Sequence, residues 1–121
     1  MHMVATVLGT SDPRALAVFY QRLLGWPIVA DEPDWVTLRP SSGGTGLSFQ
    51  FEANYVPPMW PEVVGEQQMM AHFDIAVDDL EASVVLACDA GATIADHQPQ
   101  DDVRVMLDPA GHPFCLFVGP V

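Results

Sequence analysis

The chain has 121 residues, half of them apolar, which predicts a single domain with a substantial hydrophobic core. Sixteen acidic residues outnumber four arginines, there is no lysine, and the formal net charge is −12 at pH 7. A surface this negative repels phosphate backbones and anionic lipids, so neither nucleic acid nor a membrane surface is an expected partner.

The sequence carries no sign of export or of a disulfide framework. It has no run of about 18 apolar residues that could span a bilayer, and its N-terminus lacks a basic region followed by a cleavable apolar stretch. Its two cysteines, Cys88 in a predicted helix and Cys115 in a predicted strand, are too few for a disulfide scaffold. These features predict a reducing, cytoplasmic location.

The first half of the chain is predicted to form one strand, one helix and three further strands. Val4–Leu8 is rich in β-branched residues, and Ser11-Asp12-Pro13 supplies a helix N-cap with proline in the first turn. Apolar residues then recur at helical spacing until Gly25 ends the helix. The strands predicted next are Ile28–Ala30, Trp35–Arg39 and Leu47–Phe51.

The second half repeats this order after a proline-rich loop over residues 53–68. A strand at Met70–Val77 is followed by a helix that Asp78-Asp79 caps and Gly91 ends, and then by strands at Thr93–Ala95, Val103–Leu107 and Phe114–Val118. The repeat predicts an α+β fold with two βαβββ units, residues 3–52 and 69–119, in one domain spanning 1–121. The units are expected to form a cupped, mixed but mostly antiparallel sheet, with a pocket between them.

Strand alternation predicts which side chains line this cup, because successive residues of a strand point to opposite faces. In the strand ending at Val77, Phe73 and Ile75 face the helix and leave the opposite face to His72 and Asp74. Treating Val103, Val105 and Leu107 as the helix-facing set likewise puts Arg104 on the opposite face. The residues expected on that face are Thr37, Arg39, Gln50, Glu52, His72, Asp74, Arg104 and Cys115.

Four segments of the sequence resemble a known superfamily. They are Ser-Asp-Pro-x-Ala-Leu-x-x-Phe-Tyr at 11–20, Leu-Gly-Trp at 24–26, His-x-Asp-x-x-Val-Asp-Asp-Leu at 72–80 and Asp-Pro-x-Gly-His-Pro-Phe at 108–114. Together with the paired βαβββ units, they look like the vicinal oxygen chelate superfamily, which includes glyoxalase I, bleomycin-resistance proteins and extradiol dioxygenases. Small glyoxalase-like domains are the most similar type. The resemblance covers nearly the whole chain and implies a homodimer.

The resemblance also implies where a divalent metal would bind in metal-dependent members. The four ligand positions, on the first and last strand of each unit, correspond here to Ala5, Gln50, His72 and Cys115. Ala5 offers no ligand atom, Gln50 offers only a neutral amide, and the soft sulfur of Cys115 suits zinc or copper better than magnesium or manganese. No cofactor is therefore expected, although His72, Gln50 and Cys115 remain a possible divalent-metal set.

The candidate catalytic residues are His72, Asp74 and Gln50. His72 would act as the acid–base group, with Asp74 orienting it and Gln50 polarising an oxygen of the substrate; the alternative is a satisfied polar pair without catalytic use. Ligand-binding residues are predicted at Trp35, Thr37, Arg39, Glu52, Tyr55, Trp60, Arg104 and Cys115.

Several of these residues could have a structural role instead of a role in binding or catalysis. The two arginines either clamp an anionic ligand or pair with nearby acids. Cys115 is either a nucleophile or a small apolar filler, and the aromatic residues form either a ligand wall or a dimer contact.

Three functions follow from these residues. The first is a glyoxalase-like protein that binds a small organic molecule without a classical metal site, with or without processing it. The second is a non-catalytic, drug- or metabolite-sequestering protein of the bleomycin-resistance type, which needs an aromatic wall but no catalytic residue. The third is a metal-dependent lyase or dioxygenase. Kinship at the level of fold does not choose among them.

Overall fold

The computed structural model describes residues 1–119 of the chain. It divides into two compact units, Met1–Tyr55 and Val56–Val121, and each is described by itself. The predicted linking loop at 53–68 therefore falls mostly in unit 2. Within the described residues, no helix is both long and apolar enough to cross a membrane.

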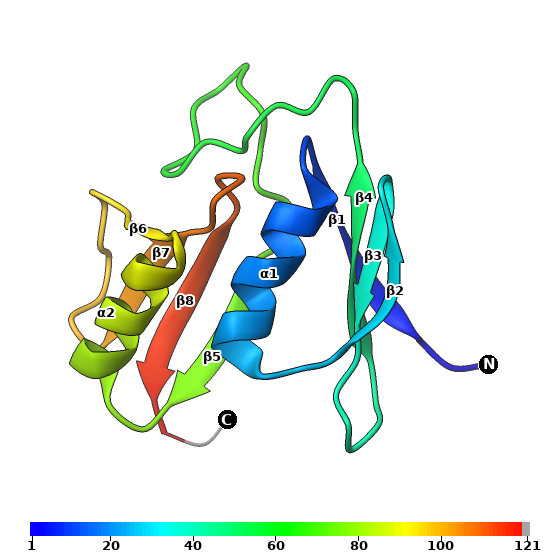
Figure 1. Cartoon of the computed structure of the whole chain (residues 1–121). Coiled ribbons are helices and arrows are strands. Elements are labelled where there is room, and N and C mark those ends of the chain that lie inside the picture. Colours follow the sequence, from blue (N-terminus) through cyan, green and yellow to red (C-terminus); the bar gives the residue numbers. More distant parts are fainter. Residues whose placement is uncertain (120–121) are drawn as a thin grey trace. The chain divides into compact units, whose positions relative to one another are not determined.

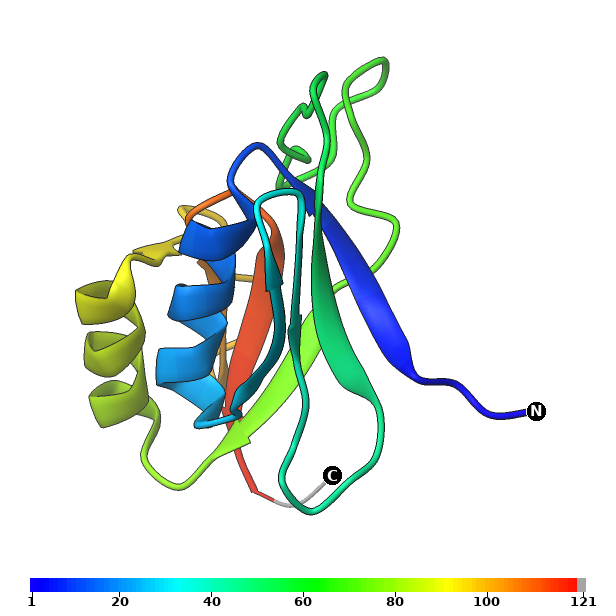
Figure 2. The same ribbon diagram turned by 45° about the vertical axis from the view of Figure 1, so that its right-hand side comes forward.

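Unit 1 is a four-stranded sheet with one helix on one face. In chain order it contains β1 (Ala5–Thr10), α1 (Pro13–Leu24), β2 (Ile28–Glu32), β3 (Trp35–Leu38) and β4 (Gly46–Phe51). The strand order is β1-β4-β3-β2, with β1 parallel to β4 and the other pairs antiparallel. Figures 1 and 2 show α1 lying along this sheet and β1, in dark blue, at its edge.

The ends of α1 follow from local chemistry, as the sequence predicts. The Asp12 carboxylate accepts a hydrogen bond from the Ala15 amide at 3.1 Å, and Pro13 occupies the first helical turn. Gly25 ends the helix in the left-handed conformation, with φ of 70°, which costs glycine little. The helix buries Tyr20, whose ring stacks on Phe49 of β4 at a centroid distance of 5.7 Å. This contact ties the helix to the sheet.

Unit 2 repeats the same topology. It contains β5 (Phe73–Val77), α2 (Leu80–Ala90), β6 (Thr93–Ile94), β7 (Val103–Leu107) and β8 (Pro113–Val118), in the strand order β5-β8-β7-β6. Strands β5 and β8 are parallel, and α2 packs on one face of the sheet (Figure 1). Asp79 caps α2 by accepting from the Ala82 amide at 3.0 Å. The predicted pair of βαβββ units is confirmed.

Strand β5 begins later than the sequence predicts. Met70 has a positive φ of 57°, and the Ala71 amide donates to the Met69 carbonyl at 2.5 Å, so a tight turn precedes the strand. The expected strand at Met70–Val77 therefore shortens to Phe73–Val77. His72 lies just before β5, between the turn and the sheet.

The predicted faces of β7 are wrong by one residue. Arg104 is paired with Leu116 of β8, whereas Val105 is paired with Cys115, and paired residues share a face. Arg104 and the fully buried Met106 thus lie on the face that α2 covers. The guanidinium of Arg104 donates to the Val103 carbonyl at 3.2 Å. Both alternating sets of residues in β7 are largely apolar, so alternation alone could not show which set faces the helix. A shift of one residue moves every side chain of the strand to the opposite face.

Candidate functional site

Unit 2 contains a small pocket over the face of its sheet that carries Cys115. Its volume is about 180 Å³. Its floor is formed by strands β7 and β8 together with His72, and its walls come from the segment before β5 and the loop before β7. The lining residues are Trp60, Met69, His72, Pro99, Gln100, Val103, Val105, Pro113 and Cys115.

The wall containing Trp60 is held by several contacts within unit 2. The Trp60 indole N–H donates to the His97 carbonyl at 3.1 Å, and the two rings lie 5.8 Å apart. The amide of Met59 donates to the Gln67 carbonyl at 2.9 Å, which closes the loop that carries the indole. A Cβ atom on Gly111, whose φ is 92°, would lie 2.9 Å from the Cβ of Pro57, so glycine lets this segment approach the turn before β8.

The opposite wall depends on Gln98, a residue that sequence reasoning missed. Its side-chain amide donates to the Val105 carbonyl and accepts from the Val105 amide, both at 2.8 Å. It also donates to the Ala95 carbonyl at 2.8 Å. The side chain thus pairs with the backbone amide and carbonyl of Val105 as a neighbouring strand would. It also holds the adjoining Pro99 and Gln100 beside the pocket. No pattern in the sequence marks a glutamine for this role.

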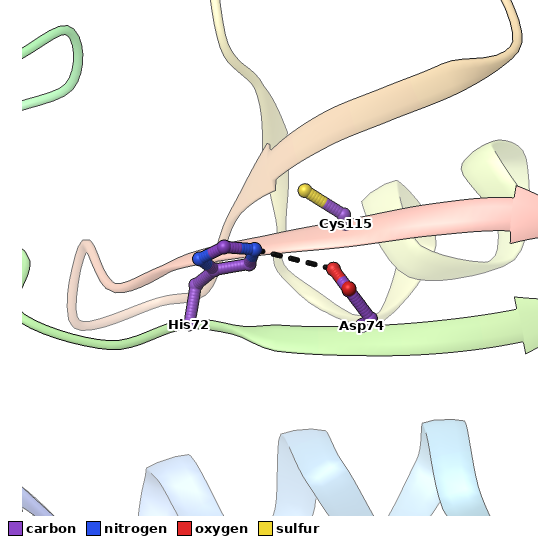
Figure 3. Close-up of side chains that lie close together, drawn as sticks. All are labelled: His72, Asp74 and Cys115. Atoms are coloured by element: carbon purple, nitrogen blue, oxygen red, sulfur yellow. Dashed lines mark ion pairs between the residues drawn. The ribbon is translucent and has the colours of Figure 1, made fainter. Parts of the chain in front are cut away.

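Three side chains with ligand atoms lie close together beside this pocket, and two of them, His72 and Cys115, line it. His72, Asp74 and Cys115 project to the same side of the sheet, His72 from the residue before β5, Asp74 from β5 and Cys115 from β8 (Figure 3). The His72 Nε2 and an Asp74 carboxylate oxygen are 3.2 Å apart, and the donor atoms of all three residues lie within 4.8 Å of one another. The His72 and Asp74 side chains are 40% and 61% exposed, so solutes can reach them. The predicted pairing of His72 with Asp74 is present.

The environment of Cys115 keeps its thiol protonated. Partial burial raises the pKa of this thiol, and the negative charge of Asp74 and a hydrogen bond to that carboxylate raise it further. A nucleophilic cysteine needs the thiolate form at working pH. The surroundings of Cys115 therefore oppose the nucleophile reading and favour a thiol that donates to Asp74.

The remaining predicted site residues lie in unit 1. The Trp35 indole donates to the Thr37 hydroxyl at 3.0 Å, and Thr37, only 6% exposed, shares a 2.9 Å hydrogen bond with Ser48. The side chains of Gln50 and Glu52 are joined by a 2.5 Å hydrogen bond. The polar groups of this face are thus paired within the unit.

Arg39 does not join this group. It follows Leu38, which is paired with Leu47, whereas Gln50 is paired with Trp35 at the other end of the same strands. Arg39 lines a shallow surface pocket with residues of the N-terminal segment, and Tyr55 is half-buried at the end of unit 1.

The strand registers correct one position in the metal set that the resemblance implied. Gly9 is paired with Gln50 in unit 1, and Asp74 is paired with Cys115 in unit 2, so the equivalent pairs are 65 residues apart. The same shift makes Val7, rather than Ala5, the counterpart of His72. Neither side chain can bind a metal, so the residues present do not fit a four-ligand metal site of that kind.

Paired βαβββ units and a pocket on the open face of a sheet define the class of protein with glyoxalase-like folds. The sequence profile of the family described as "Glyoxalase-like domain" matches residues 5–117, and the chain belongs to this family. The resemblance to the vicinal oxygen chelate superfamily is thereby confirmed.

Solved structures of similar fold span the whole chain. One is a glyoxalase/bleomycin resistance protein/dioxygenase family enzyme from Burkholderia phytofirmans PsJN, with 17% identity, 98% of each chain covered and a TM-score of 0.72. Another is a glyoxalase-related enzyme from Fulvimarina pelagi, with 20% identity, 100% of this chain and 90% of the other covered, and a TM-score of 0.71. At these identities the likeness concerns the fold alone. No curated protein sequence matches the chain significantly.

Proposed function

We propose that this protein binds a compact organic molecule in the pocket of unit 2 and transfers a proton on it through His72. The observation that carries the proposal is the composition of the pocket, which combines apolar walls with the accessible imidazole of His72, whose Nε2 contacts the Asp74 carboxylate. Apolar enclosure with a few convergent polar groups is typical of small-molecule sites.

The pocket volume limits the size of the ligand. A dry cavity of about 150 Å³ binds benzene, and sites for drug-sized molecules are about 300–1,000 Å³. At about 180 Å³, this pocket matches a single ring or a short chain. The indole of Trp60 and the side chain of Met69 provide apolar surface against which a ring can pack.

Charge limits the ligand further. Between residues 56 and 121 the sequence has eleven acidic residues, and Arg104 is its one arginine or lysine. Arg104 lies on the helix-covered face, and the described residues that line this pocket include no arginine to bind an anionic group. The negative field and the face of Trp60 favour a neutral or cationic molecule.

The chemistry proposed for His72 follows from its contact with Asp74. The His72 Nε2 lies 3.2 Å from the Asp74 carboxylate, and a neutral imidazole that donates its Nε2–H to this carboxylate carries its lone pair on Nδ1, where it can take a proton from a ligand. Polarisation of a substrate oxygen by Gln50 stays a prediction.

Sequestration without catalysis is the second candidate function. Apolar and aromatic side chains make up most of the pocket lining, and such a surface can retain a ligand without any proton transfer. On this reading, replacing His72 by alanine leaves the affinity nearly unchanged, and the protein accelerates no proton exchange.

Binding can be tested with three single-ring probes that differ in charge: benzylamine, benzyl alcohol and benzoate. In ¹⁵N-edited NMR titrations of the metal-free protein, the first two should shift the signals of Val103, Val105 and the Trp60 indole. Benzoate should bind at least about ten-fold more weakly because like charges repel. Trp60→Ala should abolish the shifts, while the matched Trp35→Phe variant in unit 1 should retain them. Shifts confined to residues outside the pocket would refute the binding site.

Proton transfer can be tested with acetophenone in D₂O. The wild-type protein should accelerate deuterium incorporation at the methyl group next to the carbonyl, and His72→Ala should reduce the rate to that of buffer. If both proteins exchange at the buffer rate while the rings still bind, the sequestration function replaces the catalytic one.

A further inference from the structure

We infer that His72, Asp74 and Cys115 form a binding site for a thiophilic divalent ion such as Zn²⁺. This site differs from the four-ligand arrangement that the superfamily resemblance implied. All three donors come from unit 2, and Asp74 is not among the implied positions.

The donor geometry is close to that of a tetrahedral zinc site. Zinc binds nitrogen and oxygen at about 2.0–2.2 Å and sulfur at about 2.3 Å, so donor atoms lie roughly 3.3–3.8 Å apart around the ion. The His72 Nε2 and the Asp74 oxygen are already 3.2 Å apart, and all three donors are within 4.8 Å of one another. The donors therefore need to approach one another by no more than about 1.5 Å to reach these separations.

The chemistry of the donors selects the class of ion. An imidazole, a carboxylate and a sulfur atom match the preferences of zinc, whereas magnesium, calcium and manganese prefer oxygen ligands. Binding replaces the proton of the Cys115 thiol, which passes to solvent, and the resulting thiolate and carboxylate balance the charge of the ion. The excess of acidic residues in this unit also attracts cations.

Three protein donors leave one tetrahedral position open. His72 and Cys115 both line the pocket proposed for the organic ligand, so a ligand atom in that pocket could occupy the open position. Zinc sites with three protein ligands and an open position bind water or a ligand atom. An ion here would occupy the His72 Nε2 and the Asp74 carboxylate, which the proton-transfer role also requires. Metal binding and proton transfer are therefore alternative uses of the same side chains.

Cobalt(II) gives a direct test because it replaces zinc and its absorption reports the ligands. The untagged, chelator-treated full chain should bind one Co²⁺, with a near-ultraviolet thiolate-to-cobalt charge-transfer band and strong visible bands of a tetrahedral ion. One equivalent of Zn²⁺ should abolish these bands. Cys115→Ser should lose the charge-transfer band, whereas the matched Cys88→Ser variant, altered at an exposed cysteine of α2, should keep it.

Two further variants make the test decisive. Asp74→Asn should weaken Co²⁺ binding at least about ten-fold, and His72→Ala should lower it further, with circular dichroism confirming that each variant is folded. Absence of the charge-transfer band in the wild type, or its survival in Cys115→Ser, would overturn the inference and leave adventitious surface binding only. Neither result bears on the organic-ligand proposal, since the aromatic probes are titrated into metal-free protein.

Discussion

The turn before β8 should control both the stability of unit 2 and the position of the pocket floor. The Asp108 side chain is fully buried, and its carboxylate accepts hydrogen bonds from the Ala110 amide at 2.9 Å and the His112 amide at 3.0 Å. It also contacts the His112 ring nitrogen at 2.8 Å. The next residue, Pro113, begins the strand that carries Cys115. Asp108→Ala removes the acceptor and leaves two amide groups of the turn without their partner.

The expected cost can be calculated from these contacts. A hydrogen bond to a charged group contributes about 1.5–3 kcal/mol, and an unsatisfied buried donor costs about 1–3 kcal/mol. Allowing for partial rescue by water, Asp108→Ala should lower the free energy of unfolding by about 3 kcal/mol. Asp108→Asn keeps the oxygen that accepts from both amides but loses the 2.8 Å contact between Oδ2 and the His112 ring, so about 1 kcal/mol is expected.

Urea unfolding followed by circular dichroism provides the measurement. With an m-value of about 2 kcal/mol/M, the Asp108→Ala midpoint should fall by about 1.5 M with no change in slope. Asp101→Ala is the matched control, because Asp101 is an exposed acid in the loop before β7 and should change stability by less than about 0.5 kcal/mol. Equal midpoints for the Asp101 and Asp108 alanine variants would refute the argument.

Two other predictions concern unit 1 and the cluster. Gly46→Ala should destabilise the protein by about 2–3 kcal/mol in the same urea assay, because the added Cβ would overlap the backbone carbonyl oxygen of Leu38. At pH 8, iodoacetamide should modify Cys115 at least about ten-fold more slowly than the exposed Cys88, because the raised pKa of Cys115 keeps it a thiol. Asp74→Asn removes the charge that raises this pKa, so the Cys115 rate at pH 8 should increase while that of Cys88 stays constant.

Each of these experiments has its own control. Ser42→Ala, at an exposed position in the turn before β4, should leave the urea midpoint unchanged, and a loss equal to that of Gly46→Ala would contradict the steric explanation. Peptide mass spectrometry separates the two cysteines in the alkylation assay. A Cys115 rate that Asp74→Asn leaves unchanged would show that the carboxylate does not influence the thiol.

The sequence predicted the elements where a local rule decides the conformation. Helix starts at Asp12 and Asp79 and the stop at Gly25 require only the chemistry of capping groups and of a left-handed backbone, both readable from neighbouring residues. The repeat then predicted two identical topologies because each half lists the same elements in the same order. Features that depend on pairing between strands distant in the sequence were harder to predict from the sequence.

The candidate site shows the same division. Alternation placed His72 and Asp74 on one face, since they are two residues apart on the same chain segment, but only the β5–β8 register brings Cys115 opposite Asp74. The error at Arg104 had a similar origin, because the direction of β7 side chains depends on the register with β8. Gln98 could not be found at all, since its side chain replaces a strand partner through contacts that leave no periodic trace.

The two units are alike in topology and different in chemistry. Where unit 2 has His72, Asp74 and Cys115, the equivalent positions of unit 1 hold Val7, Gly9 and Gln50. A Cβ atom on Gly9 would lie 2.9 Å from the Cγ of Glu52, so a side chain at that position requires the carboxylate to move away from Gln50.

The polar residues of the unit 1 face satisfy one another, through the hydroxyls of Thr37 and Ser48 and through the pair of Gln50 and Glu52. A ligand that took the bonded Gln50 amide nitrogen or the bonded Glu52 oxygen would compete with the hydrogen bond between these two side chains. The corresponding groups of unit 2 are open to the pocket: the His72 imidazole has one nitrogen on Asp74, and its side chain is 40% exposed. The accessible imidazole of unit 2 supports the proposal that a ligand or ion binds in that unit.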